Sequence, residues 1–130
     1  MNTLKEIYHL QYDESGFGSN LVNWYNQLLD KTYEDLTLSD VTRMIRQNII
    51  KDVAIEKAIE LFIEYPYAGE YKDGGLLDVL AHLDLSNIKL RKDFKEQIIK
   101  QEQKYTHFDW ENEEEKDTFA KNLKKMIASL

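Results

Sequence analysis

Residues 37–64 read TLSDVTRMIRQNIIKDVAIEKAIELFIE, a stretch that predicts two consecutive helices. Thr37 and Asp40 have the spacing of a capping box, in which a hydroxyl and a carboxylate satisfy amides of the first helical turn. One face of the helix that follows carries Val41, Met44, Ile45 and Ile49, with Asn48 as its polar member. In the next helix, over residues 53–65, apolar residues surround most of the circumference, so we expect it at the centre of the fold.

The chain before this pair is less regular. Residues 4–8 form a short amphipathic segment, and residues 11–19 contain two glycines without a helical period, which is typical of a loop. Ser19 or Asn20 is suited to cap the next helix, because its side chain can accept a hydrogen bond from a first-turn amide. A short strand over residues 8–12 is the alternative at this end of the chain.

The chain after the pair predicts three further helices. Pro66 ends the central helix, because the residue before a proline avoids the helical conformation. A turn over residues 73–75 leads into a short apolar helix that begins near Leu76. Ser86 is placed to cap a long helix, and Asn112 is placed to cap the last one.

These elements predict an all-α fold, in which residues 1–130 form a single domain, a bundle of about six or seven helices. The chain has no cysteine, which excludes disulfides and fits a reducing compartment. No apolar stretch approaches the ~20 residues that a membrane span needs, and the first residues lack the pattern of a secretory signal. We therefore expect a cytoplasmic protein that does not contact membranes.

The charge balance narrows the choice of partner. The formal net charge is −7, which argues against nucleic-acid binding, because lysine and arginine supply most of the affinity for phosphates. A helix-turn-helix over residues 39–63 is also disfavoured, since its second helix would bring Glu56, Glu60 and Glu64 to the phosphates. Cations gather over residues 86–108, where we expect a solvent-exposed helix face. They are Lys89, Arg91, Lys92, Lys95, Lys100 and Lys104.

The sequence carries no catalytic signature. The three histidines do not have metal-ligand spacing, and we expect His82, which lies among leucines, to be partly buried and structural. No serine lies in a nucleophile motif, and no glycine-rich loop is suited to cradle phosphate. With 24 acidic residues, carboxylate pairs occur by chance, so an enzyme that uses such a pair stays a third alternative. We expect no catalytic residues, no metal, no cofactor and no small-molecule substrate.

Two aromatic and acidic segments are candidates for an interface. The acidic run over residues 109–117 either complements the dipole of the last helix or attracts a basic partner, with Trp110 as an aromatic anchor. Tyr65, Tyr67 and Tyr71 lie beside acids in the loop after the central helix. They either form an interface or pack over the end of the bundle.

Two stretches resemble a known family. Residues 36–47, LTLSDVTRMIRQ, and residues 65–77, YPYAGEYKDGGLL, are similar to the helical immunity proteins of contact-dependent growth inhibition systems. The resemblance covers roughly residues 1–85. Tyr65 stands where the family often has asparagine, and Gly75 stands where an acid is usual, so no role of that acid is carried over.

The resemblance implies a protein that is not an enzyme. Members of the family bind and neutralise the C-terminal toxin domain, often a nuclease, that a neighbouring cell delivers. We expect a one-to-one complex with such a domain. We take the contacts to be acidic and aromatic: Asp13, Glu14, Glu70, Tyr71, Asp73, Trp110, Glu111, Glu113 and Glu114.

Six residues of the resembling segments are expected to be structural. Arg43, Arg46 and Gln47 are expected to buttress the loop before Leu76 through hydrogen bonds to carboxylates or carbonyls. Pro66, Gly69 and Gly74 are expected to shape that loop. The alternative function is a helical adaptor or regulatory module that binds another protein or a peptide and has no toxin partner.

Overall fold

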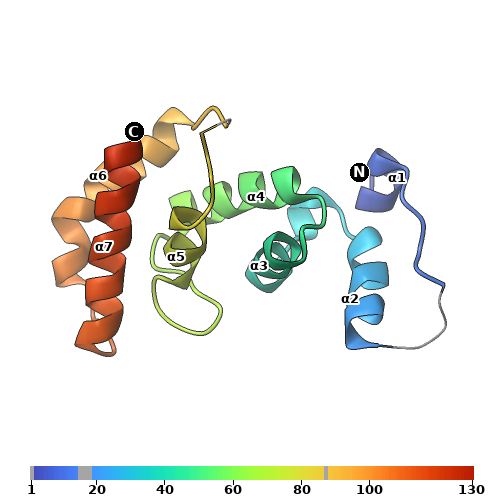
Figure 1. The fold of residues 1–130 in the computed structure, drawn as a ribbon, viewed down its shortest axis with the longest axis horizontal. Coiled ribbons are helices and arrows are strands. Elements are labelled where there is room, and N and C mark those ends of the chain that lie inside the picture. The colour runs from blue at the N-terminus through green and yellow to red at the C-terminus, as the bar shows by residue number, and fades with distance from the viewer. Residues whose placement is uncertain (1, 15–18, 87) are drawn as a thin grey trace.

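The computed structural model describes residues 2–14, 19–86 and 88–130. Within these ranges the chain forms seven α-helices and two short 3-10 helices, and no strand, so the predicted all-α fold is confirmed (Figure 1). The α-helices are α1 (Leu4–Tyr8), α2 (Asn20–Leu29), α3 (Leu38–Gln47), α4 (Lys51–Glu64), α5 (Gly75–Ala81), α6 (Lys92–Lys104) and α7 (Glu113–Ser129). The 3-10 helices are η1 (Tyr33–Asp35) and η2 (Tyr105–His107). The strand alternative over residues 8–12 was wrong, because Tyr8 ends α1 and no ladder follows.

Helix α3 begins with the predicted capping box. The Thr37 hydroxyl accepts a hydrogen bond from the Asp40 amide at 3.1 Å, and the Asp40 carboxylate accepts one from the Thr37 amide at 3.0 Å. The helix ends at Gln47 because Asn48 adopts a left-handed conformation, with φ of 55°. The prediction that Asn48 belongs to the apolar face was therefore wrong. Asn48 is the C-cap residue of α3, and its side chain is exposed.

Helix α4 is the central element, as its sequence predicted. Its buried side chains include Ala54, Ala58 and Phe62, and Phe62 packs edge-to-face on Phe94 of α6 with ring centroids 5.5 Å apart. In Figure 1, α4 spans the middle of the molecule, with α1 and α2 at one end and α6 and α7 at the other. The buried apolar residues form a core to which α1 to α7 all contribute.

Helix α6 begins later than predicted. Its N-cap is Arg91, whereas the Ser86 hydroxyl donates to the Asp84 carboxylate at 2.6 Å, so Ser86 does not cap the helix. The reason is tertiary, because Ile88 and Leu90 pack against the core from a non-helical connection. The six cations predicted to be exposed are exposed, although Lys89 and Arg91 precede the helix.

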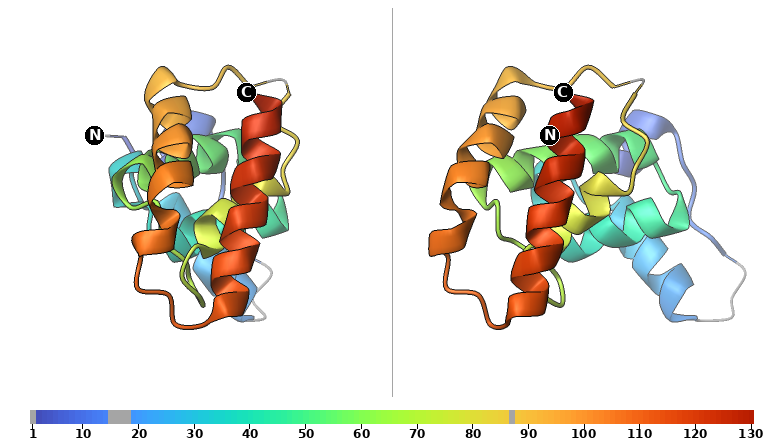
Figure 2. Two further views of the ribbon diagram at one scale, coloured as in Figure 1. Left: turned by 90° about the vertical axis from the view of Figure 1, so that its left-hand side faces the viewer. Right: turned by 60° about the vertical axis from the view of Figure 1, so that its left-hand side comes forward.

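Helices α6 and α7 run antiparallel, side by side, and a turn joins them (Figure 2). Asn112 caps α7 as predicted, and its side chain accepts a hydrogen bond from the Glu115 amide at 2.9 Å. In the described ranges, every helix is too short or too polar to cross a bilayer.

Candidate functional site

The loop that joins α4 to α5, residues 65–74, has a closely specified backbone. Tyr65 leaves the helical conformation ahead of Pro66, as predicted. The Gly74 amide then donates to the Tyr67 carbonyl at 2.7 Å. A Cβ atom on Gly69 would lie 1.7 Å from the Lys72 carbonyl oxygen, and Gly74 has φ of 77°. The loop therefore requires glycine at both positions.

Helix α3 holds the carboxylate of this loop. The Thr42 hydroxyl donates to Glu70 at 2.6 Å, and the Ser39 hydroxyl donates to it at 3.2 Å. These bonds, that of Thr42 foremost, lower the pKa of the Glu70 carboxyl, and the charge of Arg46 acts in the same direction. Glu70 is thus kept anionic in a fixed position.

The three tyrosines of the loop were predicted either to form an interface or to pack over the end of the bundle, and the structure shows both arrangements. Tyr71 is 84% exposed and Tyr65 is 62% exposed. Tyr67 instead stacks on Phe108, with ring centroids 4.0 Å apart, and lies edge-on to Trp110. The first two are available to a partner, whereas Tyr67 packs over the end of the bundle.

The turn between α6 and α7, residues 105–112, packs against this loop (Figures 1 and 2). Trp110 is half-buried, and its indole N–H donates to the Tyr105 carbonyl at 2.7 Å. A Cβ atom on Gly74 would lie 3.5 Å from the Trp110 ring. Trp110 therefore connects the turn to the loop, and only part of its ring faces solvent.

The predicted contact residues fall into two groups. The larger group lies on three adjoining segments: the α4–α5 loop, the α6–α7 turn and the first residues of α7. We call these segments together the loop–turn surface. Its members are Glu70, Tyr71, Asp73, Trp110, Glu111, Glu113 and Glu114, of which Tyr71 and the last three are exposed. Asp13 and Glu14 lie on the connection between α1 and α2, at the opposite end of the molecule in Figure 1. The structure thus brings together the loop and the turn but not the N-terminal pair.

Arg43, Arg46 and Gln47 were expected to buttress the loop, and only Arg46 lines a groove together with residues of the loop. Arg43 lies over the Trp24 ring at 4.7 Å, and Gln47 is exposed. Arg46 lines a groove of about 230 Å³ together with Glu70 and Tyr71. The hydrogen bonds from α3 to the loop come from Ser39 and Thr42, which sequence analysis missed. Their spacing of one helical turn, inside the resembling stretch, was the available signal.

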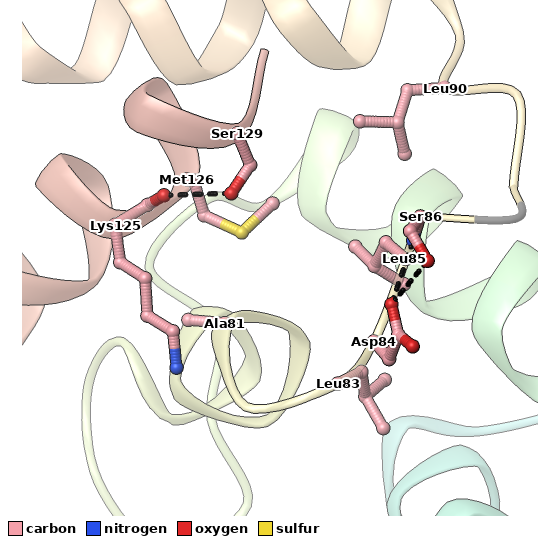
Figure 3. A pocket seen from close by; sticks show the side chains of 9 residues that line it. All are labelled: Ala81, Leu83, Asp84, Leu85, Ser86, Leu90, Lys125, Met126 and Ser129. Carbon is pink, nitrogen blue, oxygen red and sulfur yellow. Dashed lines mark hydrogen bonds between the residues drawn. The ribbon is translucent and has the colours of Figure 1, made fainter.

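Two further features of the molecule are its histidines and a cavity beside the end of α7. The described residues contain no group of three or more histidines and acids arranged to hold a metal. The prediction for His82 was wrong: its side chain is 65% exposed, because it caps α5 at the point where the buried face ends. A cavity of about 220 Å³ lies between the α5–α6 connection and the end of α7 (Figure 3). Asp84, Ser86 and Ser129 line it, but all three form hydrogen bonds within the chain.

A model of the CDI immunity proteins matches residues 6–98, which is more than half of the chain. The chain belongs to this family. The matched region extends beyond residue 85, to the middle of α6, and it includes α3, α4 and the loop that carries Glu70 and Tyr71. The turn with Trp110 and the whole of α7 lie outside it. A comparison with curated proteins gave no match.

Proposed function

We propose that this chain binds and neutralises the C-terminal toxin domain of a contact-dependent growth inhibition protein that a neighbouring cell delivers. The observation that carries the proposal is the family match over residues 6–98. The protein acts in the cytoplasm, where the delivered domain acts, and forms a one-to-one complex with it. It works by binding alone, without a cofactor or a substrate of its own.

The partner is a nuclease. A nuclease presents positive charge to its nucleic-acid substrate, and an inhibitor with a net charge of −7 is complementary to that field. Complementary charge accelerates association more than it increases affinity. Fast association suits an inhibitor that must intercept an enzyme before the enzyme reaches its substrate.

The loop–turn surface is the proposed contact. Tyr71 offers a large exposed ring beside the anchored Glu70 carboxylate, and tyrosine is among the residues enriched at binding hot spots. Glu111, Glu113 and Glu114 add negative charge at the adjoining start of α7. Hydrogen bonds from α3 and the aromatic packing of Tyr67 hold the loop in place before binding, which reduces the entropy lost on association.

Co-expression tests this function directly. The C-terminal domain encoded by the gene immediately upstream is expressed alone and together with this chain, and growth and co-purification are recorded. The proposal expects growth arrest with the domain alone, rescue by this chain and a stable complex. Nucleic acid from the arrested cells is expected to be degraded. A toxic domain that is neither rescued nor bound would contradict the proposal and favour the adaptor alternative, with the family match reduced to a likeness of fold.

A further inference from the structure

The solvent side of α4 carries a row of acids beside two adjoining hollows. Asp52, Glu56, Glu60 and Glu64 follow one another at four-residue spacing, so they neighbour each other along the helix. One hollow, of about 390 Å³, is lined by Asp52, Ile55, Glu56, Ile59, Ile88, Lys89 and Arg91. The other, of about 300 Å³, is lined by Glu34, Lys57, Glu60, Leu61, Ile63, Glu64 and Arg91. Arg91 is common to both, and we call the pair the α4 groove.

The α4 groove has unpaired acids along its rim. Within the described part of the chain, Glu34, Glu56 and Glu64 are exposed and form no ion pair. Arg91 does not neutralise them, because its guanidinium is bound to Asp93 at 2.6 Å and lies 3.5 Å from Glu60. The lining of the two hollows holds five acids and three cations, Lys57, Lys89 and Arg91, so the groove carries a small net negative charge above an apolar floor.

Lys57 is a buried cation in the same groove. Its side chain lines the second hollow, yet the residue is only 9% exposed. Its ammonium lies 4.9 Å over the Tyr33 ring, and among the described residues it forms no ion pair with a carboxylate. Lys57 Nζ is not among the fully buried polar atoms that lack a partner in the described part of the chain, so it keeps contact with solvent, and a ligand carbonyl can take the place of that water as its acceptor.

We propose that the α4 groove docks a basic segment of the toxin domain, an inference that rests on the proposed function. Lysine or arginine side chains of the segment pair with Glu34, Glu56 and Glu64. Its apolar side chains cover Leu61, Ile63 and Ile88, which are only partly buried, and one of its main-chain carbonyls accepts a hydrogen bond from Lys57. The groove adds a contact area on a different part of the molecule from the loop–turn surface.

The geometry favours a polypeptide over other ligands. The acids are spread along α4, and the described residues hold no cluster suited to a metal ion. The acidic rim repels the phosphates of a nucleic acid. Cationic side chains on an extended or helical backbone satisfy the rim, the apolar floor and Lys57 together.

Binding kinetics of matched charge variants test the inference. The probe is the upstream-encoded toxin domain, made by cell-free translation, and its association with this chain is measured at low and high salt. E56K/E64K reverses two exposed acids of the groove, and E96K/E102K reverses two exposed acids of α6, so both variants change the net charge equally. At low salt we expect E56K/E64K to associate about ten-fold more slowly than E96K/E102K, with the gap narrowing as salt rises. Thermal melting checks that both variants fold.

A second variant tests the buried cation. K57M keeps the length and apolar stem of the side chain over Tyr33 but removes the donor. We expect the complex of K57M to dissociate about ten-fold faster, since a hydrogen bond from a charged group is lost.

The outcomes separate the two proposals. A wild-type chain that fails to bind the domain overturns the proposed function, and the inference falls with it. If the wild-type chain binds the domain but E56K/E64K associates as fast as E96K/E102K at low salt, the proposed role of the α4 groove is wrong and the proposed function stands. If the K57M complex dissociates at the same rate as the wild-type complex, the proposed hydrogen bond from Lys57 to a carbonyl of the toxin is wrong.

Discussion

Gly74 lies against the ring of Phe119, so closely that a Cβ atom on the glycine would be 2.7 Å from Cδ1 of the phenylalanine. The contact joins the α4–α5 loop to α7, two segments that are distant in the sequence. It explains why the loop needs glycine for space as well as for its φ of 77°.

The substitution Gly74→Ala should therefore destabilise the fold. We expect a loss of about 2–3 kcal/mol in the free energy of unfolding, from left-handed strain and from overpacking against Phe119. Urea unfolding measures it. In a Phe119→Leu background the same substitution should cost less, because the smaller side chain relieves the clash. Equal costs in both backgrounds would show that the ring contact contributes nothing.

The Asp40 carboxylate should contribute to the acid sensitivity of the N-terminal half. Burial opposes its ionisation, but hydrogen bonds from Lys31, Thr37 and Trp24 outweigh burial and lower the pKa of Asp40. Because the folded pKa lies below the unfolded value of about 3.9, the stabilisation is present above that pH and is lost as the pH falls through the folded pKa. Asp40→Asn should cost about 2–3 kcal/mol near neutral pH and progressively less at acid pH. Unfolding curves measured from neutral pH to about pH 3 test this, and a constant difference would contradict it.

The Thr42 hydroxyl should control the titration of Glu70. In Thr42→Val the strongest hydrogen bond to the carboxylate is lost, so the pKa of Glu70 should rise toward its ordinary value of about 4.3. Titration of the side-chain carbon signals by NMR measures it, and stability should fall by about 1 kcal/mol. Ser39→Ala, which removes the longer bond, should give a smaller rise. An unchanged titration in Thr42→Val would disprove the anchoring role.

The acids at the start of α7 should affect stability and association separately. Reversal of Glu111, Glu113 and Glu114 to lysine opposes the helix dipole, for which we expect a loss of about 1 kcal/mol. If the loop–turn surface meets the toxin, the same variant also slows association and weakens its salt dependence. If the variant loses stability but binds the toxin domain with unchanged affinity and unchanged salt dependence, these acids have only a structural role.

Arg46 is expected to be structural. Arg46→Ala removes an exposed cation whose charge lowers the pKa of Glu70, so we expect a loss of about 0.5 kcal/mol in stability and near-normal toxin binding. Thermal melting and a binding titration of the same preparation decide the matter. Full stability together with abolished binding would move Arg46 from the structural set to the contact set.

Local features of this fold were predictable because their causes lie within one helical turn. The Thr37–Asp40 capping box, the Ser19 and Asn112 caps and the stop before Pro66 each depend on residues at most three apart. The central position of α4 also followed from its own composition, since apolar residues occupy most of its circumference and mainly a strip of acids faces solvent.

Features that depend on distant segments were missed or misplaced. Ser86 has the chemistry of a cap, but the packing of Ile88 and Leu90 on the core keeps the following residues out of α6 until Lys92. Lys57 is buried, and the sequence around it gave no sign of this. Its ammonium packs over the ring of Tyr33, which lies in η1, a distant part of the chain.

The sequence alone determined the helical character of the chain, the caps of α2, α3 and α7 and the positions of the acidic and aromatic residues, because these follow from interactions between near neighbours. Only the tertiary structure decided which of them meet. The stacking of Tyr67 on Phe108 and the approach of Gly74 to Phe119 place the α4–α5 loop beside the α6–α7 turn and leave Asp13 and Glu14 at the far end. Such pairings depend on how whole helices pack, and packing is a property of shape and volume that no short stretch of sequence carries.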